Sequence, residues 1–230
     1  MPSRRVLISL ALFGIGAAVV LSQTSVQDYL SSRTPRERTM RDFEEFDRKV
    51  SREPEIARAL QGLTREEDRS LKLRELSELG TARLDNGTLM ERARILSLVY
   101  SHTSDRACAD IERGSGYTEN DADELAQALT TLGHAGVKRW MEVLHRAMLA
   151  EVRKYPEPIV TRTEVMAAFV ELAKKIGSKA AIRVDAGVNV HSPDAELAYA
   201  ARTIYRVAPT LPEPHGAILL RMMEGAYRED

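Results

Sequence analysis

Cysteine and aromatic residues are scarce in this sequence of 230 residues. Cys108 is the only cysteine, so the chain forms no internal disulfide, and metal sites built from paired cysteines are excluded. Aromatic residues account for 5% of the sequence, and a hydrophobic core must therefore consist mainly of Leu, Ala, Val and Met. This composition favours helices over strands.

The sequence also lacks an excess of charge of either sign. Its 33 Lys and Arg residues are interleaved with 34 Asp and Glu residues, which gives a formal net charge of −1. Proteins that bind nucleic acid usually carry a basic excess or a basic face, and we therefore expect no nucleic-acid partner. Hydrophobic residues at 43% and charged residues at 29% are typical of a globular chain rather than a disordered one.

Motifs that mark catalytic, nucleotide or metal sites are missing as well. Residues 114–116 (Gly-Ser-Gly) lack the lysine and the preceding strand of a phosphate-binding loop. There is no Gly-x-Ser-x-Gly elbow, and His134, His191 and His215 lack the spacing of a zinc-binding helix. We predict no catalytic, cofactor-binding or metal-binding residues and expect no cofactor, and the sequence favours a protein that is not an enzyme.

The one long apolar run lies at the N-terminus. Residues 6–21 (VLISLALFGIGAAVVL) carry no charge and follow Arg4 and Arg5, an order typical of signal peptides and signal anchors. The run is slightly shorter than the roughly 17–25 residues that span a bilayer. We predict that residues 1–30 form a signal-anchor or transmembrane segment that contacts the lipid bilayer through residues 6–21. Cleavage as a signal peptide, with secretion of the remainder, is the alternative.

The basic residues that flank this run bear on its orientation. Arg4, Arg5 and the amino terminus favour a cytoplasmic N-terminus, whereas the arginines at positions 33, 36, 38 and 41 favour the opposite. We expect a single-pass membrane protein whose C-terminal domain is extracytoplasmic.

The rest of the chain divides by composition into a charged stalk and a helical domain. Residues 31–63 are densely charged, and Met40, Phe43, Phe46 and Val50 form a narrow apolar stripe with helical spacing. We interpret this stretch as a charged helical stalk. A solvated helix with a minimal apolar seam is favoured over one that rests on the domain or on a partner. Residues 64–230 form the helical domain.

Start and stop signals for helices recur along the chain. Four Thr-x-x-Glu patterns, at Thr34, Thr64, Thr88 and Thr161, are typical of capping boxes, and glycines or prolines follow the apolar runs. Helices are predicted near 35–50, 54–62, 65–79, 89–112 (with a break near 103), 119–132, 134–154, 162–176, 193–208 and 213–227. The fold class is therefore all-α, with a bundle or stack of antiparallel helical hairpins after the anchor and the stalk.

One segment departs from this pattern. Between residues 182 and 190 apolar and polar residues alternate, which suits a strand. Ala181, Val184 and Val188 would also share one face of a helix, and the only faint strand partner is Ile159-Val160. We predict helix or irregular structure here.

Two groups of residues have chemistry worth testing. Cys108 could act as a nucleophile if a histidine activated it. His102 is six residues away, and on one helix the two side chains would point in different directions. A buried core position is therefore the favoured interpretation of Cys108. Met141, His145 and Met148 share a helix face and could bind a soft metal ion, although core packing is again favoured.

The anchor, the charged helix, the stacked helices and the lack of a chemical motif together favour one function. We expect a membrane-tethered helical module for protein–protein interaction or assembly in the cell envelope, with a protein partner in or at the membrane. One alternative is a helical protein that binds a lipid or another apolar ligand, lined by Met141, Met148, Met166 and Met222. The other is an enzyme with a dispersed site in which Cys108 acts with a distant histidine.

Overall fold

The computed structural model describes residues 34–114 and 118–228. Within these ranges the chain forms eleven α-helices, so the predicted all-α class is confirmed. They are α3 (Pro35–Val50), α4 (Pro54–Ala59), α5 (Glu66–Thr81), α6 (Asn86–Tyr100), α7 (Asp105–Arg113), α8 (Glu119–Thr130), α9 (Gly133–Val152), α10 (Arg162–Ile176), α11 (Ser178–Gly187), α12 (Asp194–Val207) and α13 (His215–Met223). A 3-10 turn, η2 (Ala208–Thr210), precedes α13, and the two-residue strands β1 (Val160–Thr161) and β2 (Tyr227–Arg228) pair in parallel.

The predicted anchor, residues 1–30, lies outside the described residues. In the two described ranges no helix is both long enough and apolar enough to cross a bilayer.

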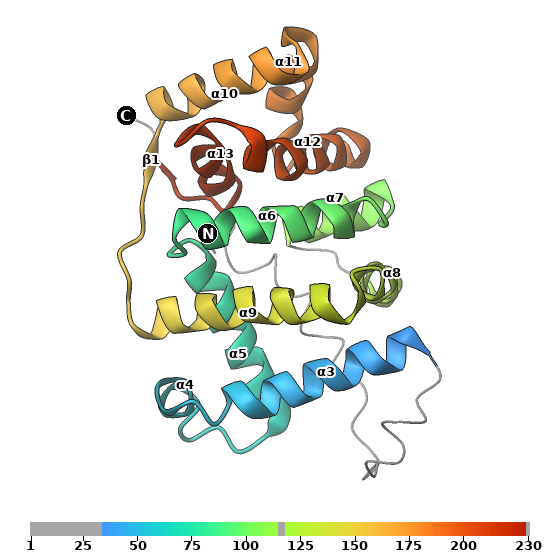
Figure 1. Cartoon of the computed structure of the whole chain (residues 1–230), viewed down its shortest axis with the longest axis vertical. Helices are drawn as coiled ribbons and strands as arrows, with labels where there is room; N and C mark the ends of the chain where they lie inside the picture. The colour runs from blue at the N-terminus through green and yellow to red at the C-terminus, as the bar shows by residue number, and fades with distance from the viewer. Residues whose placement is uncertain (1–33, 115–117, 229–230) are drawn as a thin grey trace.

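The helices form a stack of tiers (Figure 1). From one end to the other the tiers are α10 with α11, α13 with α12, α6 with α7, α9 with α8, and α4 with α3. Helix α5 runs across the stack and packs against α9. This order differs from chain order. After α9 an extended connector passes the α6–α7 tier on its way to α10 (Figure 1).

The prediction that neighbouring helices form antiparallel hairpins is therefore wrong for part of the chain. Helices α6 and α7 follow one another nearly end to end rather than folding back as a hairpin (Figure 1). The principal partner of α7 is α12, and that of α5 is α9. Sequence neighbours pack together elsewhere, as in α10 with α11 and α11 with α12.

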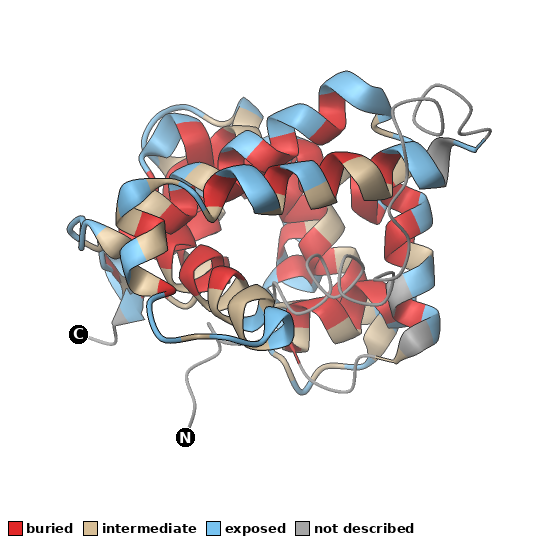
Figure 2. Ribbon diagram, turned by 90° about the horizontal axis from the view of Figure 1, so that it is seen from below, coloured by how far each residue is buried: buried red, intermediate tan, exposed pale blue. Residues whose placement is uncertain are grey.

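A single apolar cluster runs through all the tiers, from Phe43 in α3 to Met223 in α13. Trp140, Tyr100 and Tyr205 are its largest fully buried side chains. Figure 2 shows the buried faces turned towards the centre of the stack and the exposed faces turned outwards. The apolar stripe of α3 takes part, because Phe43, with 4% of its surface exposed, is buried where α3 packs on α8 and α9. The charged helix thus rests on the domain, and the favoured expectation of a solvated helix with a minimal seam is wrong.

Capping residues fix several helix starts as predicted. Thr34 with Glu37 and Thr161 with Glu164 form complete capping boxes, in which the Thr hydroxyl accepts the amide of the Glu and the Glu carboxylate accepts the amide of the Thr. Each box satisfies backbone N–H groups that the first helical turn leaves unpaired.

The other two predicted boxes are wrong. Helix α6 begins at Asn86, two residues before Thr88, because the Asp85 carboxylate accepts hydrogen bonds from both the amide and the hydroxyl of Thr88, at 2.8 and 2.7 Å. Helix α5 has Arg65 rather than Thr64 at its N-cap, and no side chain caps it. The Arg65 guanidinium instead pairs with Asp68.

The alternating segment after Gly177 is helical over most of its length. Ala181 and Val184 of α11 are buried, whereas Ile182 is 70% exposed. Val160, considered as a strand partner for this segment, pairs instead with Tyr227.

Candidate functional site

Cys108 lies in the interior of the stack, on α7. Its side chain is fully buried, and burial raises the pKa of the thiol far above its usual range, with a further increase from the nearby Glu112 carboxylate. A nucleophilic cysteine needs an electropositive and accessible setting that stabilises its thiolate. The setting of Cys108 disfavours the thiolate, so this residue packs in the core.

The burial of Cys108 leads to a first prediction. We expect the folded protein to resist modification by a disulfide-exchange reagent such as dithiobis(nitrobenzoate), because the protonated thiol is unreactive and inaccessible. The same protein in concentrated urea should react fully. Release of the thionitrobenzoate chromophore measures both rates. Stoichiometric reaction of the folded protein, as fast as that of the unfolded chain, would refute the assignment.

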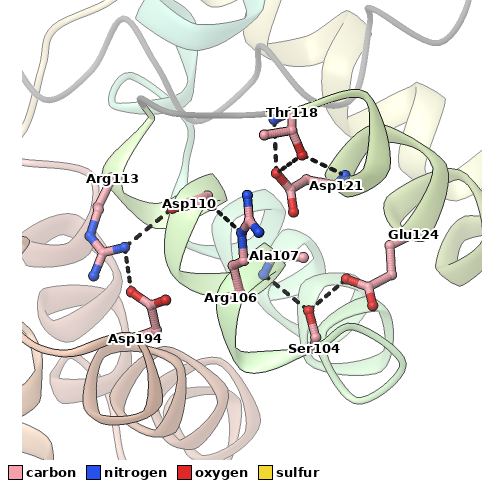
Figure 3. Close-up of polar contacts among 9 residues, drawn as sticks. All are labelled: Ser104, Arg106, Ala107, Asp110, Arg113, Thr118, Asp121, Glu124 and Asp194. Atoms are coloured by element: carbon pink, nitrogen blue, oxygen red, sulfur yellow. Dashed lines mark hydrogen bonds and ion pairs between the residues drawn. The ribbon is translucent and has the colours of Figure 1, made fainter.

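Polar residues of α7 bind one another and residues of the neighbouring helices (Figure 3). The Ser104 hydroxyl accepts the amide of Ala107 at 3.2 Å and donates to Glu124 of α8 at 2.7 Å. On the last turn of α7, the Arg113 guanidinium lies 3.2 Å from Asp110 and 2.7 Å from Asp194 of α12. These contacts tie α7 to α8 and α12, which explains them without a catalytic role.

A second polar cluster lies deeper, between the α6–α7 tier and the α12–α13 tier. Arg92 of α6 pairs with Glu224, which follows α13, at 2.5 Å, and their side chains are only 4% and 8% exposed. The Tyr100 hydroxyl donates to Glu112 of α7 at 2.7 Å, and the Tyr100 ring meets the ring of Tyr205 edge to face. Each contact joins two segments of the stack, and the cluster is closed to solvent. It is a structural element that orients the tiers.

A groove of about 600 Å³ separates α3 from α9. Phe46, Val50 and Met141 contribute apolar side chains to it, and two histidines of α9 lie along it. His134 Nδ1 is 2.9 Å from an Asp42 carboxylate oxygen, and His145 Nε2 is 3.9 Å from Glu53. Burial lowers the pKa of His145, although Glu53 opposes that shift.

The structure does not bring Met141, His145 and Met148 together as a metal site, and it does not form the methionine-lined apolar pocket. Met148 is fully buried in the core, whereas His145 faces the groove beside Met141. Met166, expected beside Met148 in an apolar pocket, is 61% exposed on α10. Among the described residues no three His, Cys, Asp or Glu side chains lie close enough together to hold a metal ion.

Two carboxyl groups, one on α3 and one on α5, have strongly raised pKa values. Burial raises the pKa of Asp47 to about 7, and Glu44 and Glu66 add to the shift. Burial also raises the pKa of Glu78 to about 8, against the attraction of Arg74, whose guanidinium is 3.6 Å away. Both groups therefore keep their protons to a higher pH in the folded protein than an exposed carboxyl group does.

These shifts predict a pH dependence of stability. The folded state holds the Asp47 proton up to a pKa of about 7, whereas the unfolded chain releases it near 3.8, so the free energy of unfolding should fall as pH rises between these values. We expect Asp47→Asn to stabilise the protein at pH 8 by on the order of 2 kcal/mol and to leave it unchanged at pH 4. Urea denaturation at both pH values measures this difference.

Glu45→Gln is the matched control, because Glu45 is an exposed carboxylate on the same helix. It should change stability little at either pH. Equal effects of the two substitutions at pH 8 would contradict the assignment.

The α10–α11 tier, at one end of the stack, carries exposed apolar side chains. We call Met166, Val170 and Ile182 the end-tier surface. Their exposed fractions are 61%, 53% and 70%. Met166 and Val170 are four residues apart and share one face of α10, opposite the side on which Val165, Ala168 and Leu172 pack inwards. Helix α10 is thus apolar on both sides, although it has a neighbouring tier on only one.

No protein family, curated protein or solved structure matches this chain. The arrangement of its own residues is therefore the basis for assigning a function.

Sequence reasoning did not identify the end-tier surface. Met166 was expected inside a pocket, and Ile182 lay in the segment of uncertain structure. One signal was present: α10 has apolar residues at Val165, Ala168 and Leu172 and again at Met166 and Val170. A helix with apolar residues on two sides presents more apolar surface than one neighbouring tier covers.

Proposed function

We propose that this protein is a membrane-tethered helical module that binds a protein partner through the end-tier surface of α10 and α11, as part of an assembly in the cell envelope. Residues 6–21 would hold it in the bilayer, with the helical domain on the extracytoplasmic side. The exposure of Met166, Val170 and Ile182 on one terminal tier is the observation that carries the proposal.

The physical argument comes from the way stacked helices are stabilised. Each tier buries its apolar face against the next, and a terminal tier needs a polar outer face to remain soluble. The α10–α11 tier has Lys174 and Lys179 on its exposed surface, but Met166, Val170 and Ile182 lie among the charges. Covering each of these three side chains contributes on the order of 1 kcal/mol. A helix or helical pair of the partner, placed as one more tier, provides that cover.

Site-specific photocrosslinking in native membranes tests the proposal. A photoreactive amino acid at Val170, near the middle of the α10 face, should yield one discrete adduct heavier than the protein itself. The same amino acid at Gln127, an exposed position on α8, is the control and should yield none. Denaturing electrophoresis and mass spectrometry of the adduct identify the partner.

Three outcomes would count against the proposal. If both positions crosslink equally, the contact is nonspecific, and if neither does, the surface is uncovered. An adduct made only of two copies of this chain would replace the partner protein with self-association.

A further inference from the structure

A second concave region lies where the end of α6 and the start of α7 meet α11 and α12. It is a pocket of about 410 Å³, within the range of roughly 300–1,000 Å³ typical of small-molecule sites. Its lining is polar and cationic, and it consists of Ser97, Ser101, Asp105, Arg183, Ala195, Tyr199, Arg202, Thr203 and Arg206.

Two of the three arginines in the pocket already have carboxylate partners. Arg183 binds Glu196 through two hydrogen bonds of 2.8 and 3.0 Å, and its guanidinium lies over the ring of Tyr199 at 3.9 Å. Arg202 pairs with Asp105 and also donates to the carbonyl of Tyr100 at 2.9 Å, at the end of α6. The carboxylate charges in and beside the pocket are therefore neutralised.

Arg206 is the third arginine and has no such partner. Its side chain is exposed on α12, and within residues 34–114 and 118–228 it makes no hydrogen bond or ion pair. The pocket consequently holds one surplus positive charge on a group that can donate two parallel hydrogen bonds.

Neutral donors line the same space. The hydroxyls of Ser97, Tyr199 and Thr203 have no hydrogen-bond partner in the described part of the chain. Thr203 is 4% exposed, so its hydroxyl is held in place by the surrounding core. Ala195 and the ring of Tyr199 add apolar surface beside these donors.

We infer that this pocket binds a small ligand that carries an oxyanion, either a carboxylate or a phosphate group. The Arg206 guanidinium pairs with the oxyanion, the hydroxyls of Ser97 and Thr203 donate to it, and the Tyr199 ring contacts the body of the ligand. Charge-assisted hydrogen bonds of this kind are stronger than those between neutral groups. The inference is independent of the proposed protein partner, because it concerns a different surface.

Isothermal titration of the detergent-solubilised full chain tests this site. The probes are inorganic phosphate, pyrophosphate and succinate, each at an ionic strength held constant with sodium chloride so that general screening is the same throughout. We expect saturable binding of at least one probe. Preference for succinate over the phosphates, or the reverse, distinguishes the two oxyanion classes.

Substitutions locate the binding. Arg206→Gln should weaken it by at least about tenfold, since one charge-assisted interaction is worth roughly that factor. Arg139→Gln, which removes an exposed arginine of α9 outside the pocket, should leave it unchanged. Thr203→Val should weaken binding by a smaller factor. Absence of saturable binding for all three probes, or equal affinity of the Arg206→Gln variant with an unchanged melting temperature, would overturn the inference.

Discussion

Replacement of Arg92 by methionine is expected to lower the free energy of unfolding by about 3 to 5 kcal/mol, the usual cost of removing one partner of a buried ion pair. Arg92 and Glu224 are almost entirely buried and lie 2.5 Å apart. Without Arg92, the Glu224 carboxylate stays in the interior without its cation, and the contact between α6 and the end of the chain is lost. Urea denaturation followed by circular dichroism measures the change.

The double variant Arg92→Met with Glu224→Leu is the control for this prediction. It removes both charges, and because apolar replacement of a whole buried pair is often close to neutral, it should recover most of the lost stability. If the single substitution costs less than about 1 kcal/mol, the pair is solvated and does not join the tiers as described.

Substitution of Gly80 by alanine is the second change with a large expected effect. Gly80 lies on α5 where this helix crosses α9, and a Cβ atom there would be 1.7 Å from the carbonyl oxygen of Ala147. The obstruction is backbone, so it cannot be relieved by a rotamer change, and the two helices must move apart. We expect a loss of about 3 kcal/mol or more, at or beyond the upper end of the usual overpacking cost.

Gly87→Ala provides the comparison, because the nearest atom to a Cβ at Gly87 is a side-chain oxygen of Asp85 at 3.1 Å. It should alter stability by no more than about 1 kcal/mol, the usual range of a Gly-to-Ala change within a helix, because only a side-chain atom must move. Denaturation midpoints of the two variants separate the effects. Equal midpoints would show that α5 and α9 do not cross as closely as described.

Local signals predicted most of the helices because the residues that begin and end them are close in sequence. The predicted break near residue 103 is present, since the Ser104 side chain accepts the Ala107 amide and starts α7 anew. The error at Thr88 has a local cause too. Asp85 is a strong N-cap residue three positions earlier, and it competes successfully for the same amide.

The order of the tiers could not be predicted, because it depends on contacts between distant residues. Nothing near Gly80 in the sequence indicates that its neighbour in space is Ala147. Likewise, nothing near Arg92 in the sequence indicates that it pairs with Glu224. The cationic pocket was missed for the same reason: Ser97, Arg183 and Arg206 come from three helices, and only the fold brings them together. Cys108 is a contrasting case, because its separation from His102 along one helix already favoured a buried core position.

The central claim is that the α10–α11 tier is completed by a partner protein, and the mass of the native complex tests it most directly. The wild-type chain, extracted from membranes in mild detergent, should migrate above its own 25.7 kDa and its detergent shell. The double variant Met166→Glu with Val170→Glu should be monomeric, with an unchanged circular dichroism spectrum. A wild-type protein that is already monomeric, or a variant that keeps the full mass of the complex, would contradict the claim.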